Sequence, residues 1–280
     1  MTVLNVDYTS AQAPKLFSES LKETGFAVLH NHCIDTNLIQ TVYQQWQEFF
    51  YSDLSNKTKY HYQKPSQAGY FPFKTENAKN HKVSDLKEFF HVYPHGPIPS
   101  ELKDNSLEMY SALQQLASKL LQWIENYLPE DVSNQLSMPL KDMSVDSDFT
   151  LLRILHYPPL PEQVADNAVR AAPHEDINLI TLLPAATAPG LEVLDNKEQW
   201  HAVPCDPGNI VVNVGDMLQM CTQYHYKSTT HRVVNPNHVI ENRSRFSMPL
   251  FLHPRKEVKL AENLTAIDYL HQRLREIGIY

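Results

Sequence analysis

Residues 149–155 (Phe-Thr-Leu-Leu-Arg-Ile-Leu) and 210–214 (Ile-Val-Val-Asn-Val) belong to the stretch that decides the fold of this chain. Three more short apolar runs of the same kind lie at 177–183, 191–194 and 246–252. Clusters of Pro, Asn and Asp separate the runs, a spacing that is typical of an antiparallel sandwich or barrel. The sequence therefore predicts a mainly β core within residues 148–255.

Helical patterns precede and follow this core. Apolar residues recur at three- and four-residue steps from Thr36 to Phe50, and again from Ser106 to Tyr127, which indicates two amphipathic helices. A shorter helix should end at Gly25, because glycine readily takes the left-handed cap conformation. Since helices come before strands, we expect one integrated domain. Its segments are a helical and strand cap at 1–104, a supporting helix and connection at 105–147, the β core at 148–255 and a C-terminal helical tail at 256–280.

Composition and charge exclude several classes of protein. The 280 residues carry a net charge of -8 without a basic run, so the chain has no electrostatic footprint for a nucleic acid. No window approaches the ~20 apolar residues that cross a bilayer. Cys33, Cys205 and Cys221 are odd in number and widely spaced, which favours reduced, packed thiols. We expect a cytoplasmic protein that binds neither nucleic acid nor membrane, and its oligomeric state stays open.

The sharpest chemical pattern is His174-Glu175-Asp176. On an extended segment residues i and i+2 share a face, so His174 and Asp176 can face one cavity while Glu175 points away. A third ligand must come from elsewhere, and His231 is the candidate because it opens another β-rich run. Two imidazoles and a carboxylate leave positions open for ligands, as in non-haem Fe(II) oxygenases, whereas structural zinc prefers four protein ligands. The alternative is a chance tripeptide around a core histidine.

A second pattern, Arg245-Phe246-Ser247, follows His231 after a short interval. Arg245 and Ser247 share a face of an extended strand, and a guanidinium beside a hydroxyl is a receptor for a carboxylate. The pair could hold the far end of a dicarboxylate whose near end binds the metal. The alternative is a surface arginine on an edge strand.

Together these motifs resemble the iron(II)- and 2-oxoglutarate-dependent oxygenases of the isopenicillin N synthase-like family, also called the iron/ascorbate oxidoreductases. The resemblance covers roughly residues 14–254. It includes the segment from Val211 to Val234, and Asp85-Leu86-Lys87-Glu88 is similar to the family's D-x-K-E motif. The resemblance implies a double-stranded β-helix, or jelly-roll, core flanked by N-terminal and supporting helices, with the active site in the barrel mouth.

The resemblance also implies which residues form that site. His174, Asp176 and His231 match the family's Fe(II) ligands, and no catalytic residue is expected beyond them. Arg245, Ser247 and Tyr157 match residues that bind the 2-oxoglutarate co-substrate, and ascorbate is a candidate reductant. The implied reaction couples oxidative decarboxylation of 2-oxoglutarate to hydroxylation, desaturation or ring closure of a small organic substrate by O2.

The sequence departs from the family's pattern at two places, and three alternative functions stay open. Leu155 stands where many relatives have asparagine, and Gln223-Tyr224 replaces the family's Asn-Gly turn, so a different turn is expected. The alternatives are an oxidase of the same family that uses no 2-oxoglutarate, a carboxylate-binding barrel without catalysis, and a zinc hydrolase with the same three ligands.

The identity of the substrate is not predicted. The aromatic segments 69–73 and 89–93 occupy places where relatives build the substrate wall, and the alternative is that they seal the cap onto the barrel. His81, His91 and His95 are interpreted as loop or surface residues.

Overall fold

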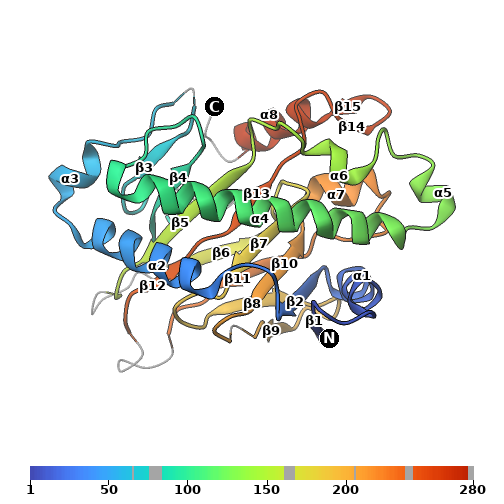
Figure 1. Ribbon diagram of the computed structural model, residues 1–280, viewed down its shortest axis with the longest axis horizontal. Coiled ribbons are helices and arrows are strands. Elements are labelled where there is room, and N and C mark those ends of the chain that lie inside the picture. The colour runs from blue at the N-terminus through green and yellow to red at the C-terminus, as the bar shows by residue number, and fades with distance from the viewer. Residues whose placement is uncertain (65, 76–83, 161–167, 205, 237–241, 277–280) are drawn as a thin grey trace.

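Two β-sheets form the body of the computed structural model, which describes residues 1–64, 66–75, 84–160, 168–204, 206–236 and 242–276 (Figure 1). The larger sheet joins, in spatial order, β1 (Asn5–Asp7), β2 (Phe26–His30), β10 (Ile210–Val214), β7 (Ile180–Pro184), β13 (Leu250–Leu252), β5 (Leu151–Tyr157), β4 (Glu88–Val92) and β3 (Gly69–Phe71), and β12 (Arg245–Ser247) also pairs with β5. The smaller sheet joins β6 (Ala171–His174), β11 (His231–Val233), β8 (Leu191–Leu194) and β9 (Trp200–Ala202). The predicted mainly β architecture with flanking helices is confirmed.

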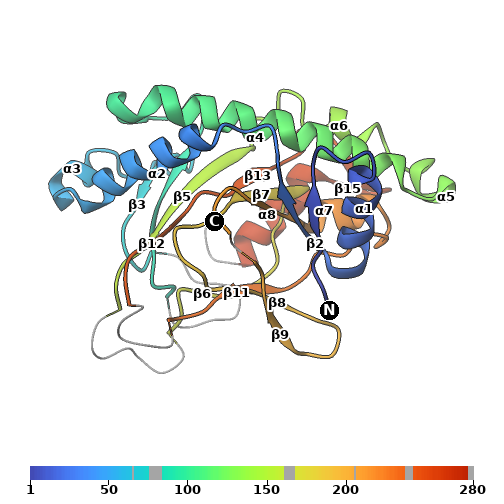
Figure 2. The ribbon, with the colours of Figure 1, turned by 60° about the horizontal axis from the view of Figure 1, so that its bottom comes forward.

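Helices cover one side of the larger sheet. Figure 2 shows α2 (Thr36–Tyr51) and α4 (Ser100–Asn126) along this side, with the smaller sheet on the other. The indole N–H of Trp46 on α2 donates to Ser106 Oγ on α4 at 2.9 Å, which fixes the two helices to each other. The other elements are α1 (Ala13–Thr24), α3 (Leu54–Thr58), α5 (Glu130–Ser133), α6 (Leu140–Met143), α7 (Asp216–Cys221), α8 (Ala266–Glu276) and the hairpin of β14 (Lys259–Ala261) and β15 (Leu264–Thr265).

Local signals explain where the long helices begin. The helix expected from Thr36 is confirmed, and the Asp35 side chain accepts from the Asn37 N–H at 2.8 Å as an N-cap. The second long helix was expected from Ser106, but α4 begins at Ser100. The sequence also contains signals for a start at Ser100, because Pro99 precedes this residue and Glu101 places a negative charge in the first turn of the helix.

Prolines set the limits of two strands that the sequence placed differently. The run at 149–155 is displaced to Leu151–Tyr157 and ends directly before Pro158. The run at 246–252 was expected as one strand, but it forms β12 and β13 on either side of Pro249. Proline has no N–H for a ladder hydrogen bond, which accounts for the end of β5 at Tyr157 and for the break between β12 and β13.

The cysteines differ in their surroundings. Cys221 is buried, as predicted, whereas Cys33 is exposed, so the packing role predicted for it is wrong. Cys205 lies outside the described residues. None of the helices in the described ranges combines the length and apolarity that a membrane crossing requires.

Gly25 ends α1 and lets a second segment come close. Its φ of +74° and the hydrogen bond from its N–H to Leu21 O confirm the predicted left-handed cap. A Cβ at this position would lie 2.7 Å from Lys227 O, so a larger residue would displace the segment that leads into β11. The end of α1 therefore helps to position His231.

A buried ionic cluster joins α3 to the larger sheet. The Glu88 carboxylate of β4 accepts hydrogen bonds from Lys57 Nζ at 2.9 Å, from His156 Nδ1 at 2.8 Å and from the Tyr70 hydroxyl. Burial would raise the pKa of Glu88, but the hydrogen bonds from His156, Tyr70 and Lys57 hold it below its usual value. Glu88 therefore stays ionised and fixes β4 to its neighbours.

We expect Glu88→Gln to lower the free energy of unfolding by about 3–5 kcal/mol, because Lys57 would stay buried without its counter-charge. The lowered pKa of Glu88 means that its contribution is present above pH 4.5, its ordinary value, and is lost as pH falls through the folded-state pKa. The acid limb of the stability profile should therefore be shallower in the variant. Urea unfolding at neutral and acidic pH measures both effects.

The matched control is Glu257→Gln, which removes an exposed partner of Arg255. Its unfolding midpoint should stay close to that of the unaltered protein, because exposed ion pairs contribute little. Equal destabilisation by the two substitutions would contradict the role of the buried cluster.

Candidate functional site

Two antiparallel strands bring the candidate metal ligands together. His174 ends β6, His231 begins β11, and the two residues are direct partners in the ladder. Asp176 Oδ1 lies 3.9 Å from His174 Nε2 and 3.8 Å from His231 Nε2. One ligand atom from each residue lies within 4.8 Å of the others. The structure thus gathers the three residues singled out by the sequence, and the group could hold a metal ion.

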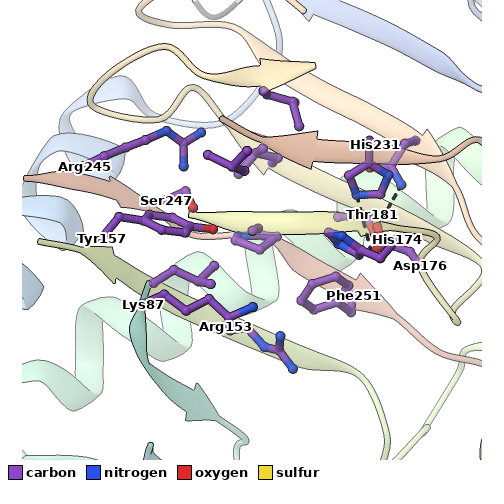
Figure 3. Close-up of a pocket in the computed structure, with 17 residues that line it drawn as sticks. Lys87, Arg153, Tyr157, His174, Asp176, Thr181, His231, Arg245, Ser247 and Phe251 are labelled. Atoms are coloured by element: carbon purple, nitrogen blue, oxygen red, sulfur yellow. Dashed lines mark hydrogen bonds and ion pairs between the residues drawn. The ribbon is translucent and has the colours of Figure 1, made fainter. Parts of the chain in front are cut away.

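Backbone carbonyls orient both imidazoles. His174 Nδ1 donates to Ala172 O at 2.8 Å, and His231 Nδ1 donates to Thr229 O at 3.1 Å. A proton on Nδ1 leaves the lone pair of Nε2 available for a metal. Both Nε2 atoms therefore point toward Asp176 as potential ligands (Figure 3).

The Asp176 carboxylate is oriented from the larger sheet. Its Oδ2 accepts from Thr181 Oγ1 at 2.6 Å and from Asn213 Nδ2 at 2.8 Å, which leaves Oδ1 facing the imidazoles. Burial would raise the pKa of Asp176, but His231, His174 and these hydrogen bonds hold it below its usual value. Burial and the neighbouring His231 lower the pKa of His174. An ionised carboxylate and a neutral imidazole are the forms that bind a metal.

Glu175 is turned away from this group. Its carboxylate accepts a hydrogen bond from the Thr230 hydroxyl. Glu175 is also absent from the described residues that line the pocket, in agreement with the alternation expected for an extended segment.

Arg245, Ser247 and Tyr157 line the same pocket as the three candidate ligands (Figure 3). Arg245 is only 1% exposed, so it is not a surface arginine. Its Nε donates to Ala188 O at 2.9 Å, and its buried Nη1 finds no hydrogen-bond partner among the described residues. A buried charged donor without an acceptor is costly, so this end of the pocket is suited to an anion.

The register of β12 on β5 sets the order of these side chains. Arg245 stands opposite Tyr157, with Cζ 5.2 Å from the ring centroid, and Ser247 stands opposite Leu155. Leu155 lines the pocket and brings no polar atom of its side chain to it. The departure from the family's asparagine therefore lies inside the site.

Gln223 and Tyr224 replace the family's Asn-Gly in the turn before β11, but the different turn that was expected is not what the structure shows. Gln223 and Tyr224 both adopt left-handed backbone conformations, with φ of 51° and 64°. Two consecutive left-handed residues are typical of the tight turns that Asn-Gly favours. The chain therefore makes this turn without glycine.

Two cationic residues of the pocket were missed as site residues. Lys87 was noticed only as part of the D-x-K-E motif, and Arg153 was not singled out at all, yet both line the pocket. The signal for Arg153 was present, since it lies two and four residues before Leu155 and Tyr157 and shares their face of β5.

The prediction that three histidines of the cap segment are loop or surface residues has a different outcome for each. His91 is buried in β4, with Nδ1 2.7 Å from Gln67 O, so the loop or surface reading is wrong for it. His95 is exposed, as predicted, and His81 lies outside the described residues.

The aromatic segments form a stack behind the pocket wall. The rings of Phe71 and Phe89 are 4.5 Å apart and stacked, and both residues pack against Leu155 and Tyr157. Neither ring is among the described residues that line the pocket. This arrangement favours the alternative in which the aromatic side chains seal the cap onto the barrel.

Comparison with known proteins identifies the family. A family model described as the 2OG-Fe(II) oxygenase superfamily matches residues 149–254, and one described as the N-terminal region of non-haem dioxygenases in morphine synthesis matches residues 6–116. A solved structure of a Caulobacter crescentus protein assigned to the 2OG-Fe(II) oxygenase family is 32% identical, covers 99% of each chain and has a TM-score of 0.82. The chain belongs to the 2OG-Fe(II) oxygenase superfamily.

Two other similarities extend over most of this 2OG-Fe(II) oxygenase. A solved Shewanella oneidensis structure described as an oxygenase is 46% identical over 100% of both chains, with a TM-score of 0.90. Gibberellin 2-beta-dioxygenase 1 of Arabidopsis thaliana is 29% identical over 97% of this chain and 84% of its own length. The protein is an Fe(II)- and 2-oxoglutarate-dependent dioxygenase with a jelly-roll core, and it oxidises a small organic substrate.

We expect Thr181→Val to weaken metal binding about 10- to 100-fold, because the Asp176 carboxylate would lose a hydrogen bond that orients it. Anaerobic calorimetric titration with Fe(II) measures the affinity, and circular dichroism checks the fold. Thr58→Val is the control, since the Thr58 hydroxyl bonds only within α3 among the contacts described. Unchanged affinity in Thr181→Val would show that Asp176 needs no such support.

Proposed function

We propose that His174, Asp176 and His231 hold the Fe(II) of this dioxygenase, and that Arg245, Ser247 and Tyr157 hold its 2-oxoglutarate. The observation that carries the proposal is a single pocket with two features at separate places. One is a group of three ligand atoms oriented toward a common point, and the other is a buried guanidinium donor without a partner among the described residues.

The donor set fits the metal. Two imidazole nitrogens and one carboxylate oxygen form the set that non-haem Fe(II) oxygenases use, and three ligands leave room for a co-substrate and O2. When bound, Fe(II) with O2 and 2-oxoglutarate supplies the oxidation of the substrate, with succinate and CO2 as the other products. His174 and His231 keep their Nδ1 protons on backbone carbonyls, so each offers Nε2 in a fixed direction.

Arg245 supports the assignment of the co-substrate. Its guanidinium is held by Ala188 O and faces Tyr157, so the Nη1 donor, which has no partner in the described part of the chain, has a defined direction. A carboxylate placed there would accept charge-assisted hydrogen bonds from Arg245 and a further one from the Ser247 hydroxyl. In this arrangement Arg245 and Ser247 fix one end of a dicarboxylate, and the metal binds its other end.

Three features that were expected from the sequence stay predictions. The cytoplasmic location is supported by the free thiols of Cys33 and Cys221. The absence of a nucleic-acid partner is supported by the negative net charge. The division into a cap, a supporting helix, a β core and a tail within one domain is supported by the larger sheet, which contains strands from both halves of the chain.

Anaerobic addition of Fe(II) and 2-oxoglutarate should produce a metal-to-ligand charge-transfer band in the visible spectrum. His174→Ala should abolish the band, because the metal would lose one of three ligands. Arg245→Gln should keep the band but raise the 2-oxoglutarate concentration for half-saturation about 10- to 100-fold, since a charged hydrogen-bond partner is lost. Arg275→Gln, an exposed substitution on α8, is the control and should behave like the unaltered protein.

The alternatives predict other results. An oxidase that uses no 2-oxoglutarate would form no band with it, although the protein would still bind Fe(II). A zinc hydrolase with the same ligands would act without O2, and a carboxylate-binding barrel would release no succinate when O2 is admitted. Any of these results would reject the assignment of 2-oxoglutarate turnover to this pocket.

A further inference from the structure

We infer that Arg170 strengthens the preference of this pocket for a co-substrate that carries a second carboxylate. It acts from behind the pocket wall, by holding the segment that leads to Arg245 and by adding a second positive charge at that end of the pocket. The inference rests on the proposed function, because it takes the Arg245 end as the place of the far carboxylate of 2-oxoglutarate. It goes further by naming a positioning residue that acts on this carboxylate through Arg245.

Arg170 connects the two halves of the site. It directly precedes β6, the strand that ends at His174, and the next residue, Ala171, lines the pocket. Its Nη2 donates to Arg243 O at 2.7 Å, two residues before Arg245 on the segment that enters β12. The Arg170 side chain therefore ties the strand of a candidate metal ligand to the strand of the co-substrate arginine.

The Arg170 guanidinium is buried behind the wall of the pocket. The residue is 2% exposed, and it is not among the described residues that line the pocket. Its Nε has no hydrogen-bond partner in the described part of the chain, and the same holds for Nη1 of Arg245. The hydrogen bonds described for the two guanidinium groups go to backbone carbonyls, which carry no net charge. An anion bound at this end would therefore offset part of the cost of burying two positive charges.

Tyr157 is a common neighbour of the two guanidinium groups. Cζ of Arg245 lies 5.2 Å from the Tyr157 ring centroid. Burial, followed by the charge of Arg245, lowers the pKa of Arg170 to about 10, so Arg170 stays charged at neutral pH. Figure 3 shows Arg245, Ser247 and Tyr157 at one end of the pocket, away from His231. The charge of Arg170 thus adds to that of Arg245 at the end remote from the candidate metal ligands.

The two ends of the co-substrate should feel this charge unequally. The Coulomb energy falls with distance, and buried charges are screened little by salt. A carboxylate beside Arg245 is close to Arg170, whereas the oxo acid end binds the metal at the other end of the pocket. Arg170 therefore favours a dicarboxylate over a monocarboxylate of the same length.

The hydrogen bond to Arg243 O supports the same preference through geometry. The next residue, Ser244, is held from the other side, because its Oγ lies 3.0 Å from His156 Nε2 on β5. Arg245 then pairs with Tyr157 in the ladder of β12 and β5. The approach to Arg245 is thus fixed to both β6 and β5, so the distance between this guanidinium and the metal group is set before a ligand binds. A dicarboxylate that spans both places gains from such positioning.

The test compares two oxo acids that differ only in the far group. 2-Oxoglutarate has a second carboxylate, whereas 2-oxopentanoate has a methyl group in its place. Both present the same oxo acid end to the metal. Each is titrated anaerobically into protein that holds Fe(II), and the charge-transfer band gives the concentration for half-saturation. The unaltered protein should bind 2-oxoglutarate more tightly than 2-oxopentanoate.

Arg170→Met should raise the half-saturating concentration of 2-oxoglutarate about 10-fold, because a buried charge near the far carboxylate is lost. The value for 2-oxopentanoate should not change. Arg170→Lys should retain most of the preference, since it keeps the positive charge although it loses the planar fork. A merely structural role of Arg170 would instead weaken both oxo acids.

Arg255→Met is the matched control. Arg255 also donates to backbone carbonyls, those of Asp142 and Val145, but it is not among the described residues that line the pocket. Both oxo acids should bind this variant as they bind the unaltered protein. Thermal unfolding checks that each variant is folded, and Arg170→Gln replaces Arg170→Met in the comparison if the latter does not fold.

Two outcomes would overturn the inference. One is that Arg170→Met weakens both oxo acids equally, and the other is that it weakens neither. Failure of the proposed function is a separate result, namely no charge-transfer band with either oxo acid in the unaltered protein. In that case calorimetric titration of both oxo acids into the metal-free protein decides the role of Arg170 by the same criteria. Equal affinities of the unaltered protein for the two would then also overturn it.

Discussion

The pairing of His231 with His174 between β11 and β6 is the constraint on which the rest of the site depends. Side chains alternate along a strand, so a slip of one residue would turn one imidazole to the opposite face of the smaller sheet. Asp176 is held from the larger sheet by Thr181 of β7 and Asn213 of β10. The candidate metal group therefore requires both sheets in their correct relative positions, and the jelly roll provides this.

The segment Asp85-Leu86-Lys87-Glu88 connects the cap to the strand that carries His174 and to the buried cluster around Glu88. Asp85 accepts from the N–H of Ala172, and the carbonyl of Ala172 accepts from His174 Nδ1. Glu88, on the opposite face of β4, joins the buried cluster with Lys57 and His156. This run of four residues, three of them charged, thus contributes Lys87 to the pocket and Glu88 to the buried cluster. This explains why such polar residues are buried here rather than exposed to solvent.

The sequence alone predicted which side chains share a face when the residues lie close together on one extended segment. The spacing of His174 and Asp176, and that of Arg245 and Ser247, required only the alternation of an extended strand. His231 was a candidate because it opens a β-rich run, and the family resemblance supported the choice. No local rule shows that residues so far apart along the chain come together. The overall β core was predictable from short apolar runs, although the limits of its strands depended on individual prolines.

Contacts between distant segments were not predictable in this way. Arg153 belongs to an apolar run, and its place in the pocket follows from strand pairing that only the fold reveals. His91 looked like a loop residue because proline-rich segments surround it, yet it faces Arg153 across the ladder of β4 and β5. The buried position of Glu88 likewise depends on Lys57 and His156, which lie in other segments.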